Sequence, residues 1–90
     1  MPITKQNLLR HELIGLEARV ENSSDPTLLG IHGTIIDETR DMLVIEQAGG
    51  SKIVPKASSK FIFTLPGGEG VEVEGAKLVG RPEERVRRRR

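Results

Sequence analysis

Apolar and polar residues alternate along most of the chain, and a period of two predicts β-strands that are buried on one face. In LEARVEN (16–22), Leu16, Ala18 and Val20 alternate with charged residues. Similar patterns predict strands at LLGIHGTIIDE (28–38), MLVIEQ (42–47), SKIVPK (51–56), SKFIFTL (59–65) and GVEVEG (70–75). Close turns separate these stretches. The pattern therefore predicts a mostly β fold, a small antiparallel barrel or sandwich of five or six strands.

Two local signals refine this prediction. Ser23–Pro26 has turn chemistry, because the Asp25 side chain can accept a hydrogen bond from a neighbouring backbone amide and Pro26 fixes its own φ. Gly30 and Gly33 lie within the second predicted strand, where glycine is typical of a bulge or a sharp bend. Such bends allow a short sheet to close on itself.

The two ends of the chain depart from the period of two. TKQNLLRHE (4–12) predicts a short helix with Thr4 as N-cap and an apolar stripe that Leu8 and Leu9 form with Leu13. In GRPEERVRRRR (80–90), proline and two glutamates precede the arginines, the order that a helix dipole favours. This segment is too short to be stable alone, so we expect it to fray when free and to order on a partner.

The chain of 90 residues thus predicts one domain, with a helical segment at 1–14, a barrel at 15–79 and a basic helix or tail at 80–90. The absence of cysteine excludes disulfides and thiolate metal sites. No apolar run is long enough to span a membrane and no signal-peptide pattern is present, so we expect a cytoplasmic protein.

Charge is distributed unevenly. Residues 80–90 carry a net charge of +4, whereas residues 1–79 carry −3. Clustered arginines favour phosphate binding. With only two Phe and no Tyr or Trp, the chain lacks platforms for stacking single-stranded bases. The composition therefore indicates folded RNA, bound through its backbone and shape.

Candidate catalytic groups are few. His11 and His32 could act as a general acid–base pair in a stand-alone ribonuclease, although separate structural roles are the more common outcome for isolated histidines. Asp37, Glu38 and Asp41 cluster around one turn and could bind Mg²⁺, but turn acids are usually solvated. We predict no catalytic residue and no metal ligand in this chain.

Several longer stretches resemble the archaeal ribonuclease P protein component 1 family, whose eukaryotic relatives serve in ribonucleases P and MRP. They are NLLRHELIGLEARV (7–20), SSDPTLLGIHGTIIDETRDMLVIE (23–46), VPK (54–56), FIFTLPGG (61–68) and EGAKLVGRPEER (74–85). HELIGL, GTIIDET and GRPEER are specific in this order and spacing, and the resemblance covers nearly the whole chain.

The resemblance implies an Sm-like, SH3-like barrel in a non-catalytic subunit of ribonuclease P, which removes 5′ leaders from precursor tRNA. It implies that the RNA and its Mg²⁺ perform the cleavage and that this chain binds no cofactor. The implied partners are the specificity domain of the ribonuclease P RNA and a zinc-ribbon protein subunit, with precursor tRNA contacted indirectly and no membrane.

The family's basic positions match residues that we expect to contact RNA, and the arginines that follow extend the set by their charge. The predicted RNA-binding residues are Arg10, His11, Arg40, Lys56, Arg81, Arg85, Arg87, Arg88, Arg89 and Arg90. The stripe of Leu8 and Leu9 is the predicted protein contact. Besides the stand-alone ribonuclease, the alternative function is a scaffold module that binds mainly protein through this stripe.

Overall fold

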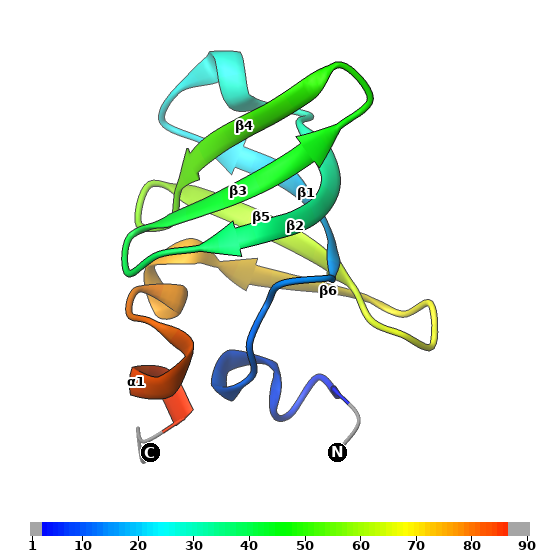
Figure 1. Ribbon diagram of the computed structural model, residues 1–90, viewed down its shortest axis with the longest axis vertical. Helices are drawn as coiled ribbons and strands as arrows, with labels where there is room; N and C mark the ends of the chain where they lie inside the picture. Colours follow the sequence, from blue (N-terminus) through cyan, green and yellow to red (C-terminus); the bar gives the residue numbers. More distant parts are fainter. Residues whose placement is uncertain (1–2, 87–90) are drawn as a thin grey trace.

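The structure, a computed structural model, describes residues 3–86. Six strands form one antiparallel sheet in the order β4-β3-β2-β1-β5-β6. Their bounds are β1 (Glu17–Ser23), β2 (His32–Glu38), β3 (Met42–Gln47), β4 (Gly50–Pro55), β5 (Ser59–Thr64) and β6 (Gly70–Glu74). The sheet curls strongly, so that β2 and β3 cross in front of β5 (Figure 1). The prediction of a small, mostly β, barrel-like domain is confirmed.

Short helical segments lie beside the sheet. They are the 3₁₀ turns η1 (Leu8–Arg10), η2 (Pro26–Leu28) and η3 (Gly75–Leu78) and the α-helix α1 (Pro82–Val86). Figure 1 shows η1 and α1 next to each other at one end of the sheet. No helix in residues 3–86 is long and apolar enough to cross a membrane.

The concave side of the sheet holds the core. Alternating residues of each strand point inward, and the buried apolar side chains include Ala18, Val20, Ile35, Leu43, Ile45, Val54, Phe61, Phe63, Val71 and Val73. Leu8 and Leu13 from the N-terminal segment and Leu78 from η3 complete it. The core therefore depends on both ends of the chain as well as on the strands.

The predicted N-terminal helix over 4–12 is wrong in extent, because only Leu8–Arg10 form a 3₁₀ turn. Backbone at His11 is extended, and the Leu13 amide donates to the Glu38 carboxylate instead of to a helical carbonyl. This path lets both Leu8 and Leu13 reach the core. Tertiary packing has overridden a weak local preference for helix.

The second predicted strand begins later than expected. Residues 26–28 form η2, which Asp25 caps by accepting a hydrogen bond from the Thr27 amide at 3.0 Å, as the turn chemistry predicts. Gly30 lies at a φ of 79° in the turn before β2, which is the bend predicted there, and a further irregularity, a bulge, lies where the register between β2 and β3 shifts between Ile35 and Asp37. This bulge proves important for the functional site.

Gly75 gives a direct test of the packing between η3 and the loop after β4. A Cβ at this position would lie 1.9 Å from the Lys56 carbonyl oxygen and 2.5 Å from that of Ser59. Because both contacts are with backbone, Gly75→Ala should lower the free energy of unfolding by about 1–3 kcal/mol. Urea unfolding checks this.

Gly67→Ala is the matched control, because a Cβ there meets no atom within 4 Å. Its effect should stay within about 0.5 kcal/mol. Equal urea midpoints for the two variants would contradict the close approach seen at Gly75.

Candidate nucleic-acid interface

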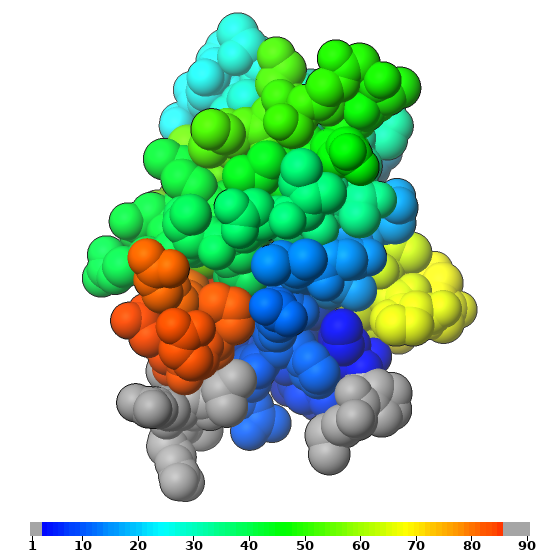
Figure 2. Space-filling view, viewed as in Figure 1, coloured from blue at the N-terminus to red at the C-terminus, as the bar shows by residue number. Residues whose placement is uncertain are grey.

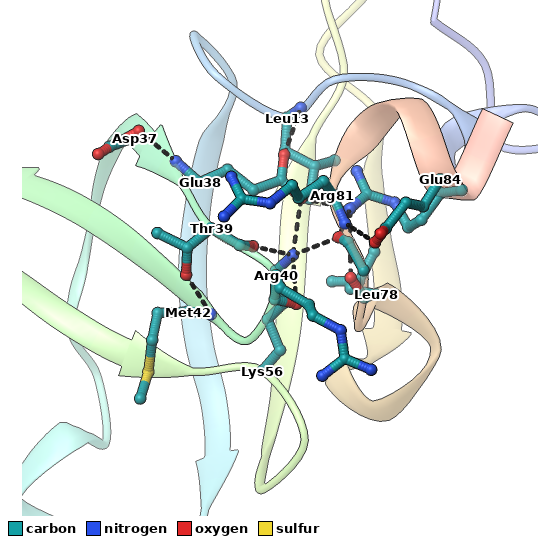
Figure 3. A network of polar contacts seen from close by, with 12 residues as sticks. Leu13, Asp37, Glu38, Thr39, Arg40, Met42, Lys56, Leu78, Arg81 and Glu84 are labelled. Atoms are coloured by element: carbon teal, nitrogen blue, oxygen red, sulfur yellow. Dashed lines mark hydrogen bonds and ion pairs between the residues drawn. The ribbon is translucent and has the colours of Figure 1, made fainter.

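Three charged side chains meet in the interior at the end of the sheet where η1 and α1 lie. Glu38 accepts hydrogen bonds from Lys56 Nζ at 2.8 Å and from Arg85 Nη1 through the same oxygen, Oε2. Its other oxygen accepts from the Leu13 amide at 3.3 Å. These contacts join β2, the loop after β4, α1 and the N-terminal segment (Figure 3). We call Glu38, Lys56 and Arg85 the buried charge cluster.

The bulge in β2 explains why an acidic residue points inward here. Simple alternation from the buried Ile35 would direct Asp37 into the core. The register shift between Ile35 and Asp37 reverses this parity, so Glu38 pairs with the buried Leu43 and lies inside. Asp37 instead stays exposed and accepts a hydrogen bond from the Glu38 amide at 2.8 Å.

Lys56 binds three backbone carbonyls in addition to Glu38. Its Nζ donates to the oxygens of Thr39 at 2.7 Å, Gly80 at 2.9 Å and Arg40 at 3.3 Å. The side chain is fully buried. Burial lowers the pKa of Lys56, while the hydrogen bond from Lys56 to Glu38 acts in the opposite direction. The ammonium form fits a site composed only of acceptor oxygens.

Arg85 uses its guanidinium to join the two ends of the chain. Nε donates to the Leu9 carbonyl at 2.9 Å, and Nη2 donates to the His11 carbonyl at 2.7 Å. Nη1 also reaches the carbonyls of Leu78 at 3.2 Å and Gly80 at 2.8 Å. The planar fork thus holds the N-terminal segment and the start of α1 in one fixed arrangement.

These contacts correct part of the prediction for RNA-binding residues. Lys56 and Arg85 retain only 0% and 1% of their accessible surface. Within residues 3–86, no buried side-chain nitrogen or oxygen lacks a hydrogen-bond partner. A direct phosphate contact by Lys56 or Arg85 does not fit this arrangement. The sequence could not reveal this role, because a lysine or arginine near a turn has the same pattern whether it is exposed or buried.

The other predicted RNA-binding residues within residues 3–86 lie directly beside the buried charge cluster. The Arg40 carbonyl accepts a hydrogen bond from Lys56, and the His11 carbonyl accepts one from Arg85. Arg10 precedes His11, and Arg81 follows Gly80. The side chains of Arg10, Arg40 and Arg81 are exposed. We call Arg10, His11, Arg40 and Arg81 the basic end.

The electrostatics of the basic end favour anions. Arg40 lies 3.5 Å from Asp41 in a surface pair whose members are both more than half exposed, so its charge remains accessible. No salt bridge occupies Arg10 or Arg81 in residues 3–86. By contrast, Lys60 is paired with Glu72 and Glu74 of β6, which raise its pKa and balance its charge. The arginines Arg87–Arg90 lie outside the described residues.

The two histidines do not form a catalytic pair. His11 adjoins Arg85 near Glu38 at one end of β2, whereas His32 begins β2 at the other end. Seven strand residues span about 20 Å, too far for one proton-transfer site. His32 Nδ1 lies 3.1 Å from the Gly30 carbonyl instead.

The acidic cluster at the turn after β2 is also divided. Glu38 is buried and bound by two cations, while the Asp41 carboxylate faces Arg40. No group of three His, Cys, Asp or Glu side chains in residues 3–86 is arranged to hold a metal ion. The carboxylates at this turn therefore take part in the buried charge cluster and in a surface ion pair.

Comparison with known proteins agrees with this geometry. A family model described as "Ribonuclease P/MRP, subunit p29" matches residues 6–88. "Ribonuclease P protein component 1" of Thermofilum pendens is 52% identical over 90 residues, covering 99% of this chain and 96% of the relative. The protein of the same name from Methanothermobacter thermautotrophicus is 48% identical over 88 residues, covering 97% and 95%.

A solved structure, "Structure of Mth11: A homologue of human RNase P protein Rpp29", has a similar fold. Its TM-score is 0.61 at 48% identity, and the similarity covers 84% of this chain and 99% of that one. The likeness is thus found in both sequence and architecture.

Proposed function

Because this chain belongs to the ribonuclease P/MRP subunit p29 family, we propose that its basic end binds the RNA of ribonuclease P. As a subunit of that ribonucleoprotein, it is part of the enzyme that removes 5′ leaders from precursor tRNA. The proposed role is to stabilise the RNA fold and to raise substrate affinity, while the RNA performs catalysis with its own Mg²⁺.

One observation carries this proposal. Residues 10–11, 40 and 81 are far apart in the sequence, yet the buried charge cluster binds the backbone at or beside each of them. Guanidinium groups fixed in this way can form bidentate contacts with phosphates without first losing backbone freedom. Arginines at fixed backbone positions can match the arrangement of phosphates on a folded RNA, so this surface suits recognition of RNA by its shape.

The finer partners are also proposals. We infer that the RNA contact lies in the specificity domain and that a zinc-ribbon subunit binds this chain. Leu9 is 38% exposed beside Arg10 and can contribute to a protein contact. Leu8, the other predicted contact, is 1% exposed and belongs to the core instead.

The RNA proposal predicts a specific loss of salt dependence. Each phosphate contact contributes about 0.7–0.9 to the slope of log K against log salt concentration. Replacing Arg10, Arg40 and Arg81 by alanine should therefore flatten the slope by about 2–3 and weaken binding at low salt. Filter binding with ribonuclease P RNA over a range of salt concentrations measures this.

Arg19→Ala provides the control, because Arg19 is an exposed arginine on β1 that pairs with Glu21 at 3.4 Å. It should leave the slope unchanged. A triple variant with the wild-type slope would show that the basic end does not touch the RNA.

A further inference from the structure

The convex face of β2, β3 and β4 carries an apolar surface, and within residues 3–86 no other element covers it. Val44 and Ile53 are directly paired across β3 and β4, and Asp37 of β2 pairs with Val44 on its other side. Ile36 projects at the bulge in β2. Ile53 is 64% exposed and Ile36 is 44% exposed, while Val44 is half-buried. We call Ile36, Val44 and Ile53 the convex patch.

Figure 2 views the molecule from the side on which β2, β3 and β4 lie in front, and these strands form the visible surface there. Large exposed aliphatic side chains that are neighbours across strands are unusual on a small monomeric domain. The core does not need them, because the opposite side of these strands already packs with Ile35, Leu43 and Val54. The convex patch is therefore available for an external partner.

Acidic residues flank the convex patch along β1, β2 and β3. Thr34 pairs with Glu17 of β1 on one side and Glu46 of β3 on the other, which places both glutamates in the strand row next to the patch. Asp37 lies in the same row as Val44. No salt bridge to any of these three carboxylates is present in residues 3–86.

Lys52, the nearest basic residue on β4, does not offset the negative charge beside the convex patch. Lys52 pairs with the buried Ile45, so its side chain leaves the sheet on the other side from Ile53. The convex patch is thus apolar with a negative rim, the opposite of the basic end.

We propose that the convex patch docks a protein whose contact surface is apolar and flanked by lysine or arginine. Carboxylates repel RNA phosphates and anionic lipids, so neither fits this face. A second copy of this chain fits poorly too, because a two-fold interface would place the acidic rim against itself. A basic protein partner satisfies both the apolar and the charged part of the face.

This inference rests on the proposed function, since it assigns the face to another protein subunit of the same ribonucleoprotein. RNA would then bind the basic end while a protein binds the convex patch, which is separate from Leu9. The subunit would connect RNA to protein by presenting opposite charges on two surfaces.

The test uses the full chain and each of the other protein subunits of the same ribonuclease P, purified singly and treated with nuclease. Titration calorimetry compares the wild type with Ile53→Asp and Glu46→Lys. Each variant should weaken the complex with one and the same subunit by about tenfold or more, the size expected of a central interface residue. Both positions are exposed, so neither change disturbs the core.

Asn22→Asp is the matched control, because it adds the same carboxylate to an exposed position of β1 that pairs with Lys60 of β5, outside both the convex patch and its acidic rim. It should leave affinity for every subunit unchanged. Wild-type affinity of both test variants for all subunits would overturn the proposal, and so would a wild-type chain that binds none of them.

RNA affinity separates this proposal from the previous one. Ile53→Asp should bind ribonuclease P RNA as the wild type does, and loss of RNA binding in this variant would assign the convex patch to RNA and overturn the inference. The alanine variants of Arg10, Arg40 and Arg81 should behave in the opposite way, losing affinity for RNA and keeping affinity for the protein subunit.

Discussion

Glu38→Ala is expected to lower the free energy of unfolding by about 3–5 kcal/mol, because it leaves buried cations without a counter-charge. Lys56 and Arg85 both bind Oε2 of this carboxylate, and neither can reach solvent without opening the end of the domain. Since small domains are stable by only about 5–15 kcal/mol, a large fraction of the protein should unfold at moderate temperature. Thermal and urea unfolding, followed by circular dichroism, measure the loss.

Two further variants sharpen this expectation. Glu38→Gln keeps the size of the side chain and one acceptor oxygen, but it removes the charge and replaces the other acceptor oxygen by a donor amide, so most of the loss should persist. Glu46→Gln removes an exposed carboxylate and should change stability by no more than about 0.5 kcal/mol. Wild-type stability of Glu38→Ala would contradict the buried charge cluster.

Arg85→Met should release both ends of the chain from the sheet and weaken RNA binding, although Arg85 itself does not face solvent. The change keeps an unbranched side chain of moderate length but removes the hydrogen bonds that Arg85 donates to the carbonyls of Leu9, His11 and Leu78, while the Gly80 carbonyl keeps its bond from Lys56. Unsatisfied buried carbonyls favour local opening, because each costs about 1–3 kcal/mol when it is left without a donor. Amide hydrogen exchange should therefore accelerate in η1 and α1 before it does so in the strands.

RNA binding by Arg85→Met shows whether Arg85 positions the basic end or contacts the RNA itself. If Arg85 only positions the basic end, Arg85→Met should weaken RNA affinity. The slope of log K against log salt should stay closer to the wild-type value than the affinity does, because bound RNA orders the basic end again and the same phosphates are contacted. Arg85→Lys should not restore the wild-type RNA affinity or salt dependence, since a single ammonium group cannot replace the planar guanidinium of Arg85. Unchanged hydrogen exchange in η1 would contradict the role of Arg85 as the link between the two ends.

Much of the fold could be predicted from the sequence because the strands are short and one-sided. MLVIEQ became β3 with the expected bounds, 42–47, since Leu43 and Ile45 point inward and their neighbours do not. Alternation is a reliable signal wherever one face of a strand is buried. It failed at the N-terminus, where the leucines served the core without a regular helix.

The site was harder to predict, because its central residues are charged yet buried. Lys56 and Arg85 were expected on the surface, as most such residues are. Glu38 could be identified as inward-facing only by knowing that β2 contains a bulge just before it, and a bulge leaves little trace in one sequence. Arg10, Arg40 and Arg81 were predicted from the matching basic positions of the family that the sequence resembles, but their proximity depends on the contacts of the buried residues.

The contacts of Arg85 also constrain when the protein becomes functional during its synthesis. Its guanidinium bonds to Leu9 and His11 close loops of 76 and 74 residues, among the longest separations in the chain. Contacts of such long range form late in folding, since nearly all the intervening chain must be ordered first. A nascent polypeptide on the ribosome can therefore fold its first hairpins, but the basic end is assembled only after Arg85 has left the ribosome.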